Sequence, residues 1–164
     1  TGRVRLDPLI VSKSTYDDLT KHSLMFWTGI ERNASDILEG QKKKIPNRIN
    51  ELTHLRDMTL QCRELLLADR LDMGALGILL DKNWRIKREL GDNVTTDFID
   101  SSYEKARTAG AMGGKIAGAG GGGFLYLLAA PQNHESIRKA LGGLEEVKIR
   151  LEPRGSRRIH GNVL

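Results

Sequence analysis

Cysteine, aromatic residues and long apolar runs are all scarce in this chain. The one cysteine, Cys62, excludes a disulfide framework and the paired-cysteine motifs of metal and redox sites, and its helical spacing places it in the core. Aromatic residues are 5% of the chain and form no stacking motif, so nucleic-acid binding is not expected. No apolar run reaches the roughly 20 residues of a membrane span, and Thr1 begins no signal peptide. We therefore expect a cytoplasmic protein that does not enter membranes.

The chain is basic overall, with 26 Lys and Arg residues against 21 Asp and Glu residues. The resulting net charge of +5 favours an anionic partner such as a phosphorylated ligand. The basic runs at residues 42–44 and 154–158 are typical of solvated faces and identify no partner by themselves. The four histidines, His22, His54, His134 and His160, have no metal-ligand spacing and are expected to be ordinary residues.

A length of 164 residues is enough for one domain with a sizeable core. Apolar alternation and short apolar runs predict strands at residues 3–6, 9–11, 24–30, 115–117, 124–129 and 147–151. Helical spacing and capping residues predict helices at 14–21, from 33 or 35 to 45, at 49–66, at 72–87, from 95 or 96 to 110, and at 133–141. Strands at both ends and a helical middle indicate an α+β fold rather than a repeating βαβ fold.

Two polar residues accompany the apolar stripe of the helix at 72–87. Asn83 and Lys87 fall beside the end of the stripe that carries Trp84. Residues in such positions either reach water at the boundary of the core or line a pocket. In the helix that follows residue 95, the side chains expected to face inward are Phe98, Ser102 or Tyr103, and Ala106.

The most unusual stretch is KIAGAGGGGFLYL, residues 115–127, in which residues 118–123 are five glycines and one alanine. Gly118, Gly120 and Gly123 match the pattern G-x-G-x-x-G. A dinucleotide-binding loop would lead into a helix, and a Walker loop would end in Gly-Lys-Ser/Thr. A protein-kinase loop would be accompanied by a strand lysine and by H-R-D and D-F-G segments. None of these contexts is present, because Phe124 opens an apolar strand.

Two interpretations of the glycine run remain. It is either a turn without a ligand or a strand–loop–strand unit whose peptide N–H groups lie bare. Ordinary turns need only one or two glycines, which favours the second interpretation. A loop without Cβ atoms can close around an anion or pack directly against another backbone.

The stretch GKIAGAGGGGFLYL resembles the third conserved motif of the GHMP kinases, the superfamily of galactokinase and of homoserine, mevalonate and phosphomevalonate kinases. LMFWTGIERNASDIL, residues 24–38, resembles the strand and helix that open the C-terminal domain of the sugar-kinase branch. DKNWRIKREL (81–90), GAMGGKIAGAGGGGF and GSRRIH (155–160) are most similar to D-glycero-D-manno-heptose 7-phosphate kinases. L-fucose kinases share the glycine motif and are the next most similar.

The resemblance implies a ferredoxin-like GHMP kinase C-terminal domain, with a mostly antiparallel sheet of about four strands and helices on one side. It also implies that residues 1–164 are a single domain, the C-terminal half of a sugar kinase. The P-G-G-x-x-D-like first motif, the Gly/Ser-rich second motif and the catalytic aspartate used by some members belong to the N-terminal half, and the sequence contains none of them. We therefore expect this chain to pair with that absent half, and its docking surface could also support a homodimer.

The resemblance also assigns roles to residues. The third motif lies beside the phosphate loop and helps to hold the substrate, and here it corresponds to Gly118, Ala119, Gly120, Gly121, Gly122 and Gly123. ATP with Mg²⁺ would be bound mainly by the absent half, so we assign no metal ligand to this chain. The resemblance likewise places no catalytic residue in it. A phosphorylated sugar would need cations around its phosphate. The candidates for sugar-phosphate binding are Arg32, Asn83, Lys87 and Arg88.

The implied function is transfer of the γ-phosphoryl group of ATP to a sugar hydroxyl, with a heptose 7-phosphate as the first candidate substrate. L-fucose, or the substrate of another GHMP sugar kinase, is the alternative within the family. A different class of function is a non-catalytic module that binds a small anion or a protein. In either case the chain alone is expected to have no kinase activity.

Overall fold

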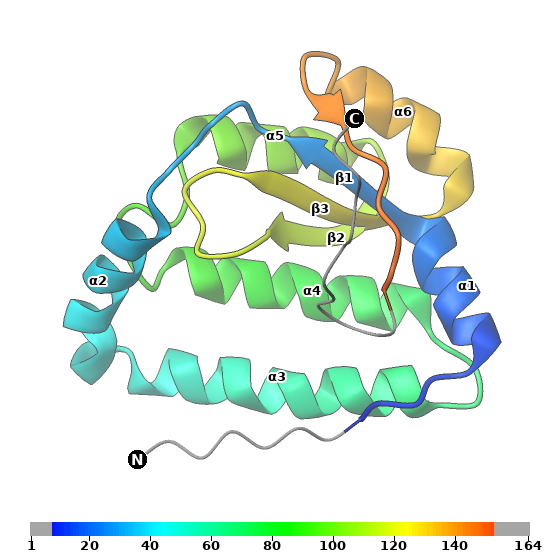
Figure 1. Cartoon of the computed structure of the whole chain (residues 1–164), viewed down its shortest axis with the longest axis horizontal. Helices are drawn as coiled ribbons and strands as arrows, with labels where there is room; N and C mark the ends of the chain where they lie inside the picture. The colour runs from blue at the N-terminus through cyan, green and yellow to red at the C-terminus, as the bar shows by residue number, and fades with distance from the viewer. Residues whose placement is uncertain (1–7, 153–164) are drawn as a thin grey trace, which may run out of the picture.

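An antiparallel sheet of four strands, in the order β2-β3-β1-β4, organises the chain (Figure 1). The computed structural model describes residues 8–152. The central pair consists of β1 (Ser23–Trp27) and β3 (Phe124–Ala129), with Phe26 opposite Leu125. Strand β2 (Ala111–Ile116) and the two-residue β4 (Glu145–Glu146) form the edges. The predicted α+β class and the antiparallel sheet of four strands are confirmed, whereas helices lie on both faces of the sheet and not on one side only.

Six α-helices surround the sheet within the described residues. Four of them begin at a side-chain cap, in which the oxygen of Ser12, Asn33, Asp72 or Thr96 accepts a hydrogen bond from a backbone N–H of the first turn. Asp72 is thus the cap that the sequence predicts, and of the two alternatives at each of the other sites the caps are Asn33 and Thr96. The first helix is capped by Ser12, two residues before the expected cap Ser14. The helices are α1 (Lys13–His22), α2 (Ala34–Lys44), α3 (Ile49–Leu67), α4 (Met73–Arg88), α5 (Asp97–Thr108) and α6 (His134–Ala140).

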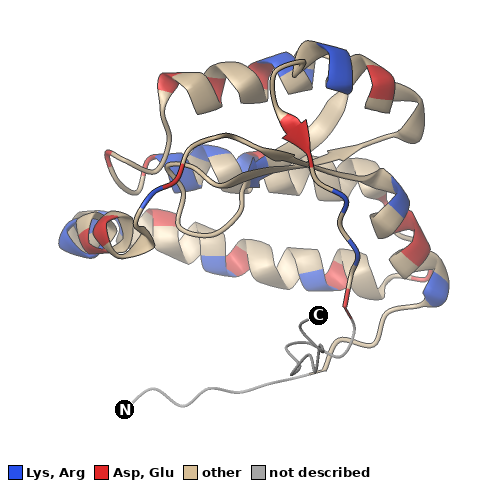
Figure 2. Ribbon diagram, turned by 45° about the horizontal axis from the view of Figure 1, so that its top comes forward, with Lys and Arg blue, Asp and Glu red and all other residues tan. Residues whose placement is uncertain are grey.

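Alternating residues of the strands face two different apolar clusters. Leu125 and Leu127 of β3 face the main cluster, which α5 and α6 cover with Ile99, Tyr103 and Ile137. Leu128 points the other way, into a smaller cluster formed with α3 and α4. Helix α4 runs beside edge strand β2, and α3 packs against α4 (Figure 1). The turned view of Figure 2 shows the sheet almost edge-on, with α5 and α6 on one side and α3 on the other.

Close packing of α4 on β2 depends on two small residues. A Cβ atom at Gly113 would lie 1.9 Å from the carbonyl oxygen of Gly77, and one at Gly77 would lie 2.4 Å from the Cβ of Met112. The helix therefore approaches the strand backbone directly. This approach brings the last turn of α4 beside the loop that leaves β2.

Some local predictions are wrong, and each has a physical reason. Residues 9–11 form no strand, and Ile10 is 86% exposed without a neighbouring strand to cover it. The segment 147–151 extends the sheet by one bond only, from Val147 N to Met25 O, and then turns toward α1, where the Tyr16 hydroxyl donates to Leu151 O. The strand predicted at residues 3–6 lies outside the described residues.

Two inward-facing assignments also need correction. Phe98 is 48% exposed, and the next residue, Ile99, occupies the core in its place. A shift of one residue turns a helical side chain by about 100°, so the true inward set is Ile99, Ser102, Tyr103 and Ala106. Cys62 packs against the smaller cluster but is only partly buried, because α3 touches that cluster at its rim. Within residues 8–152, no helix is both long and apolar enough to span a bilayer.

Candidate functional site

The glycine run forms the loop between β2 and β3, and much of its backbone lies in the left-handed region. Non-glycine residues rarely adopt this region, because their Cβ atom clashes with the backbone. The loop therefore depends on its glycines for its path, and the interpretation as an ordinary turn is weakened. The loop residues with φ between 74° and 108° are Gly118, Gly120, Gly121 and Gly123.

Two of these glycines also lie directly against other backbone. A Cβ atom at Gly120 would lie 2.6 Å from Val94 O, and one at Gly121 would lie 2.6 Å from Asn93 O. The Gly121 N–H donates to Val94 O at 2.7 Å. The turn before α5 therefore supports the loop by backbone-to-backbone contact that no larger residue would permit.

Only part of the loop's hydrogen-bonding capacity is used internally. The Gly123 N–H donates to Ile30 O at 2.8 Å, and Gly123 O accepts from both the N–H and the hydroxyl of Thr28. Within residues 8–152, the consecutive N–H groups of residues 118–120 and that of Gly122 donate no hydrogen bond. Consecutive backbone N–H donors without an internal partner are candidates for binding an anion.

An open pocket of about 390 Å³ lies beside the loop. The opposite wall is formed by Trp27, the last residue of β1, and by Glu31 and Arg32 of the segment that follows the strand. Within the described residues Arg32 has no ion-pair partner, and its Cγ would lie 3.7 Å from a Cβ placed on Gly121. The structure thus brings Arg32, predicted from the sequence, to the glycine loop.

Asn83 and Lys87 also lie next to the loop, from the other side. The Lys87 ammonium donates to the carbonyl oxygen of Gly118. Asn83 Oδ1 accepts from the Lys115 ammonium at 3.5 Å. Burial, together with the nearby positive charge of Lys115, lowers the pKa of Lys87 to about 8. Neither side chain lines the pocket beside the loop. Both are partly buried and contact the end of β2 and the start of the loop, which is a boundary position.

Arg88 is engaged elsewhere. Its guanidinium lies 3.4 Å from a carboxylate oxygen of Asp100 on α5 and 3.8 Å from one of Glu89. Neighbouring positions on a helix point about 100° apart, so Arg88 cannot share the direction of Lys87. The structure therefore separates Arg88 from the other three predicted residues.

Sequence reasoning missed two features of this region. One is Lys115, the only charged residue of β2, three positions before Gly118. Its position inside a strand of small and apolar residues was the available signal. The other is an aromatic pair, in which the rings of Trp27 and Phe124 have centroids 4.9 Å apart and planes tilted by 51°, and of which Trp27 lines the pocket. These two rings are opposite each other on β1 and β3, a pairing that only the register reveals.

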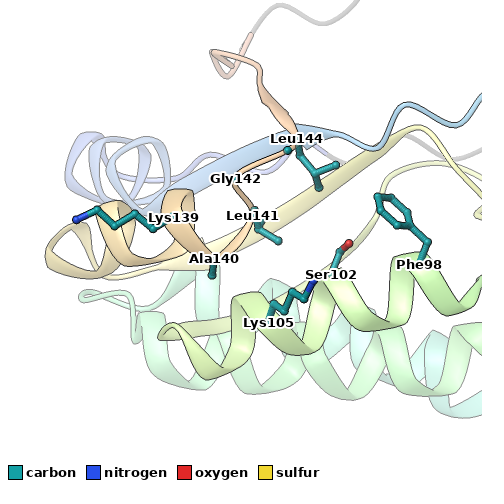
Figure 3. Close-up of a pocket in the computed structure, with 9 residues that line it drawn as sticks. Phe98, Ser102, Lys105, Lys139, Ala140, Leu141, Gly142 and Leu144 are labelled. Atoms are coloured by element: carbon teal, nitrogen blue, oxygen red, sulfur yellow. The ribbon is translucent and has the colours of Figure 1, made fainter.

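A second hollow of about 330 Å³ lies between α5 and α6 and shares no residue with the loop pocket. In Figure 3, Phe98 and Leu144 point toward each other across it, while Lys139 is directed away. It has no free backbone loop comparable to residues 118–120. We therefore take the glycine-loop pocket as the candidate functional site. Within residues 8–152, no group of three or more His, Cys, Asp and Glu side chains could hold a metal ion.

Comparison with known proteins points to one family. Residues 63–146 match the family model described as GHMP kinases C terminal. A D-glycero-alpha-D-manno-heptose 7-phosphate kinase from Campylobacter jejuni is 30% identical over 141 residues, which are 85% of this chain and 41% of that protein. A bifunctional fucokinase/GDP-fucose pyrophosphorylase from Arabidopsis thaliana is 28% identical over 148 residues, 88% of this chain and 14% of that protein.

Solved structures agree on the fold. The crystal structure of L. major mevalonate kinase in complex with R-mevalonate superposes with a TM-score of 0.65 at 25% identity, and covers 76% of this chain and 40% of the kinase. The chain thus spans less than half the length of each of these three relatives.

Proposed function

The chain belongs to the GHMP kinase C-terminal family, and from this premise we propose that it is the C-terminal half of an ATP-dependent sugar-phosphate kinase, with residues 1–164 as a single domain. The proposed substrate is a heptose 7-phosphate, which receives the γ-phosphoryl group of ATP on a sugar hydroxyl. The observation that carries the proposal is the glycine loop, with three consecutive free N–H donors beside an open pocket. The similarity to a heptose 7-phosphate kinase supports the choice of substrate.

In this proposal the loop positions phosphate. Phosphoryl transfer depends on alignment and on neutralising charge more than on covalent chemistry by the protein. The backbone of Asn93 and Val94 fixes the loop at Gly120 and Gly121. Its free N–H groups are therefore oriented before the ligand arrives, which reduces the cost of ordering them in the transition state.

The phosphate already on the sugar would be held by side chains around the loop. Arg32 offers a guanidinium at the pocket wall, and Lys87 with Asn83 borders the loop on the α4 side. Arg88 has a different role in this proposal, because its pairing with Asp100 ties α4 to α5.

The rest of the site would come from the N-terminal half of the same kinase. The free loop donors fit a nucleotide phosphate, so residues 118–120 would contact ATP, whose phosphates supply the group that is transferred. Mg²⁺ and the catalytic base would be held by the other half. We propose a cytoplasmic enzyme, and a chain that is inactive without the N-terminal half.

Phosphate transfer from labelled ATP tests this proposal. The complete two-half kinase and this chain alone should each be assayed with D-glycero-D-manno-heptose 7-phosphate, L-fucose, galactose and mevalonate. We expect turnover by the complete kinase on the heptose phosphate and none by the chain alone. Ordinary kinase turnover by the chain alone would refute the half-enzyme assignment, and a complete kinase inactive on the heptose phosphate would refute the substrate.

L-fucose is the second candidate, because of the similarity to a fucokinase domain. An unphosphorylated sugar would make no use of the cations around the loop. Replacing Arg32 with Gln would therefore raise the KM for a heptose phosphate but leave the KM for L-fucose almost unchanged. The same variant thus separates the two substrates within one experiment.

A further inference from the structure

Two lysines from different elements meet beside the glycine loop. Lys87 lies on the last turns of α4, and Lys115 lies near the end of β2. Lys87 donates to Gly118 O, and Lys115 donates to Asn83 Oδ1 at 3.5 Å. Asn83 and Lys87 are four residues apart and share one face of α4. Two contacts therefore join this helical face to the end of β2 and the start of the loop.

Neither ammonium group is neutralised by a carboxylate within the described residues. The nearest acid on the same helix, Asp81, accepts from Arg85 at 2.9 Å and from the Tyr103 hydroxyl at 2.6 Å, toward α5. The neighbour contributed by α3 is a thioether, since Asn83 Nδ2 lies 4.0 Å from Met58 Sδ. Two partly buried positive charges close together without a counter-charge are unfavourable. An anion bound between the two ammonium groups would compensate their charge and lower the electrostatic free energy.

We infer that Lys87, Lys115 and Asn83 form a binding site for a dianionic phosphate group, separate from the free N–H donors of the loop. Each ammonium group has three N–H donors and uses one of them in the structure, so four remain for a ligand. The Asn83 amide, whose present contact with sulfur is weak, can supply a further donor. The site therefore offers the donors that phosphate oxygens require.

The ligand in question is the phosphate already carried by the substrate rather than a phosphate of ATP. The loop presents a carbonyl oxygen to Lys87 and keeps its free N–H groups at residues 118–120 for a different anion. Two anion sites on either side of Gly118 suit a reaction in which both partners carry phosphate. This identification of the ligand rests on the proposed function, whereas binding of phosphate by the lysines is a property of the chain itself.

Titration of inorganic phosphate and inorganic sulfate into the ¹⁵N-labelled chain at pH 7.5 tests the site directly. We expect saturable shifts of the Lys115 and Gly118 amide signals. Lys87→Met and Lys115→Met should each weaken the apparent affinity about tenfold, the effect of losing one charge-assisted hydrogen bond. Lys115→Arg should retain binding. The matched control is Lys82→Met, an exposed lysine on α4 that should leave affinity unchanged.

Calorimetry provides a second readout. Because Lys87 has a pKa of about 8, a bound dianion should raise it, and the chain should take up protons on binding sulfate at pH 8.5. The heat of binding should then depend on the ionisation enthalpy of the buffer, and Lys87→Met should remove much of this dependence. Shifts that do not saturate, or an equal loss of affinity in Lys82→Met, would overturn the inference. Thermal melts of each variant confirm that the comparison is made between folded proteins.

Kinetics of the complete kinase separate this inference from the proposed function. Lys115→Met should raise the KM for the phosphorylated sugar about tenfold and leave the KM for ATP unchanged. If the kinase does not turn over a heptose phosphate but the chain binds sulfate through these lysines, the substrate assignment fails and the site stands. If turnover is normal and Lys115→Met changes neither KM nor sulfate binding, the site fails and the proposed function stands.

Discussion

The two faces of the sheet differ in how completely they are covered. Leu125 and Leu127 of β3 are fully buried beneath α5 and α6. On the opposite face, at the end of the strands near the glycine loop, Phe124 remains 36% exposed and Lys115 is only partly buried. The covered face holds the chain together, whereas the half-covered face collects the loop, the lysines and the aromatic pair. A half-covered apolar face next to a site is where we expect the N-terminal half of the kinase to dock.

The largest expected difference is in the free energy of unfolding lost when one apolar side chain of each face is replaced by alanine. Leu127→Ala removes a fully buried side chain and should lower the free energy of unfolding by about 3 kcal/mol. Phe124→Ala, on the same strand but on the half-covered face, should lower it by about 1 kcal/mol. Urea denaturation of both variants measures the difference. Equal losses would mean that the second face contributes to the core as much as the first.

The glycine loop also contains one open and one tightly packed position within six residues. Gly118 and Gly120 both have positive φ, but only a Cβ at Gly120 would collide with another backbone, at 2.6 Å from Val94 O. Gly118→Ala should therefore cost about 1 kcal/mol of stability from backbone strain alone. Gly120→Ala should cause the same strain and should also push the loop away from Val94. Because the loop is then displaced, the turnover of the complete kinase should fall about a hundredfold.

Steady-state kinetics and thermal melts of both variants give the outcome. Gly143→Ala is a suitable control, because a Cβ there meets nothing within 4 Å and the residue lies away from the loop. If Gly118→Ala and Gly120→Ala reduce turnover equally, support from Val94 is not what orients the loop. If neither does, the loop is a turn without a catalytic role.

The unfavourable charge on the half-covered face should appear as a dependence of stability on pH. The pKa of Lys87 falls from 10.5 in the unfolded chain to about 8 in the folded one, mainly through burial and also through Lys115, whose own pKa is lowered by burial. At Lys87 the unfolded chain therefore binds more protons than the folded chain between pH 8 and about 10. The contribution of this group to stability should rise with pH across this window, on the order of 1 kcal/mol after screening by solvent. The raised pKa values of Cys62, Tyr103 and Tyr126 act in the opposite direction, so the effect of Lys87 is the difference between the wild-type chain and Lys87→Met.

Urea denaturation at intervals from pH 7.5 to 10 measures this slope. Lys87→Met should reduce the slope and should raise stability at pH 7.5, where the charged lysine is least favourable. Lys82→Met, which removes an exposed lysine of the same helix, should leave the slope as it is. Equal pH slopes in the wild-type chain and in Lys87→Met would contradict the electrostatic account of the site.

The features that could be predicted from the sequence are those that depend on residues close together in the chain. The glycine loop was predictable, because six residues with five glycines have few explanations and Phe124 excluded the helix-linked ones. Helix starts at Asn33, Asp72 and Thr96 followed from capping chemistry that is local in sequence. These features depend on neighbours within a few positions.

Features that depend on distant segments were less accessible. The importance of Lys115 depends on α4 lying against β2, and Gly77 and Gly113 permit that approach although they are far apart in the chain. The inward face of α5 was misjudged by one residue because Phe98 and Ile99 are both apolar, and only the position of the sheet decides between them. Arg88 could be distinguished from Lys87 only once Asp100 was known to lie beside it.

The smallest expected effect concerns the two arginines predicted to bind the sugar phosphate. Arg88 is 25% exposed and its partner Asp100 is 35% exposed, so Arg88→Gln should cost less than about 1 kcal/mol of stability. Because Arg88 faces α5, this variant should not change the KM of the complete kinase for a phosphorylated sugar. Arg32→Gln makes the matched comparison and should raise that KM about tenfold with little loss of stability, since Arg32 has no ion pair to lose within residues 8–152. A KM raised by Arg88→Gln but not by Arg32→Gln would place the sugar phosphate at the junction of α4 and α5 and not around the glycine loop.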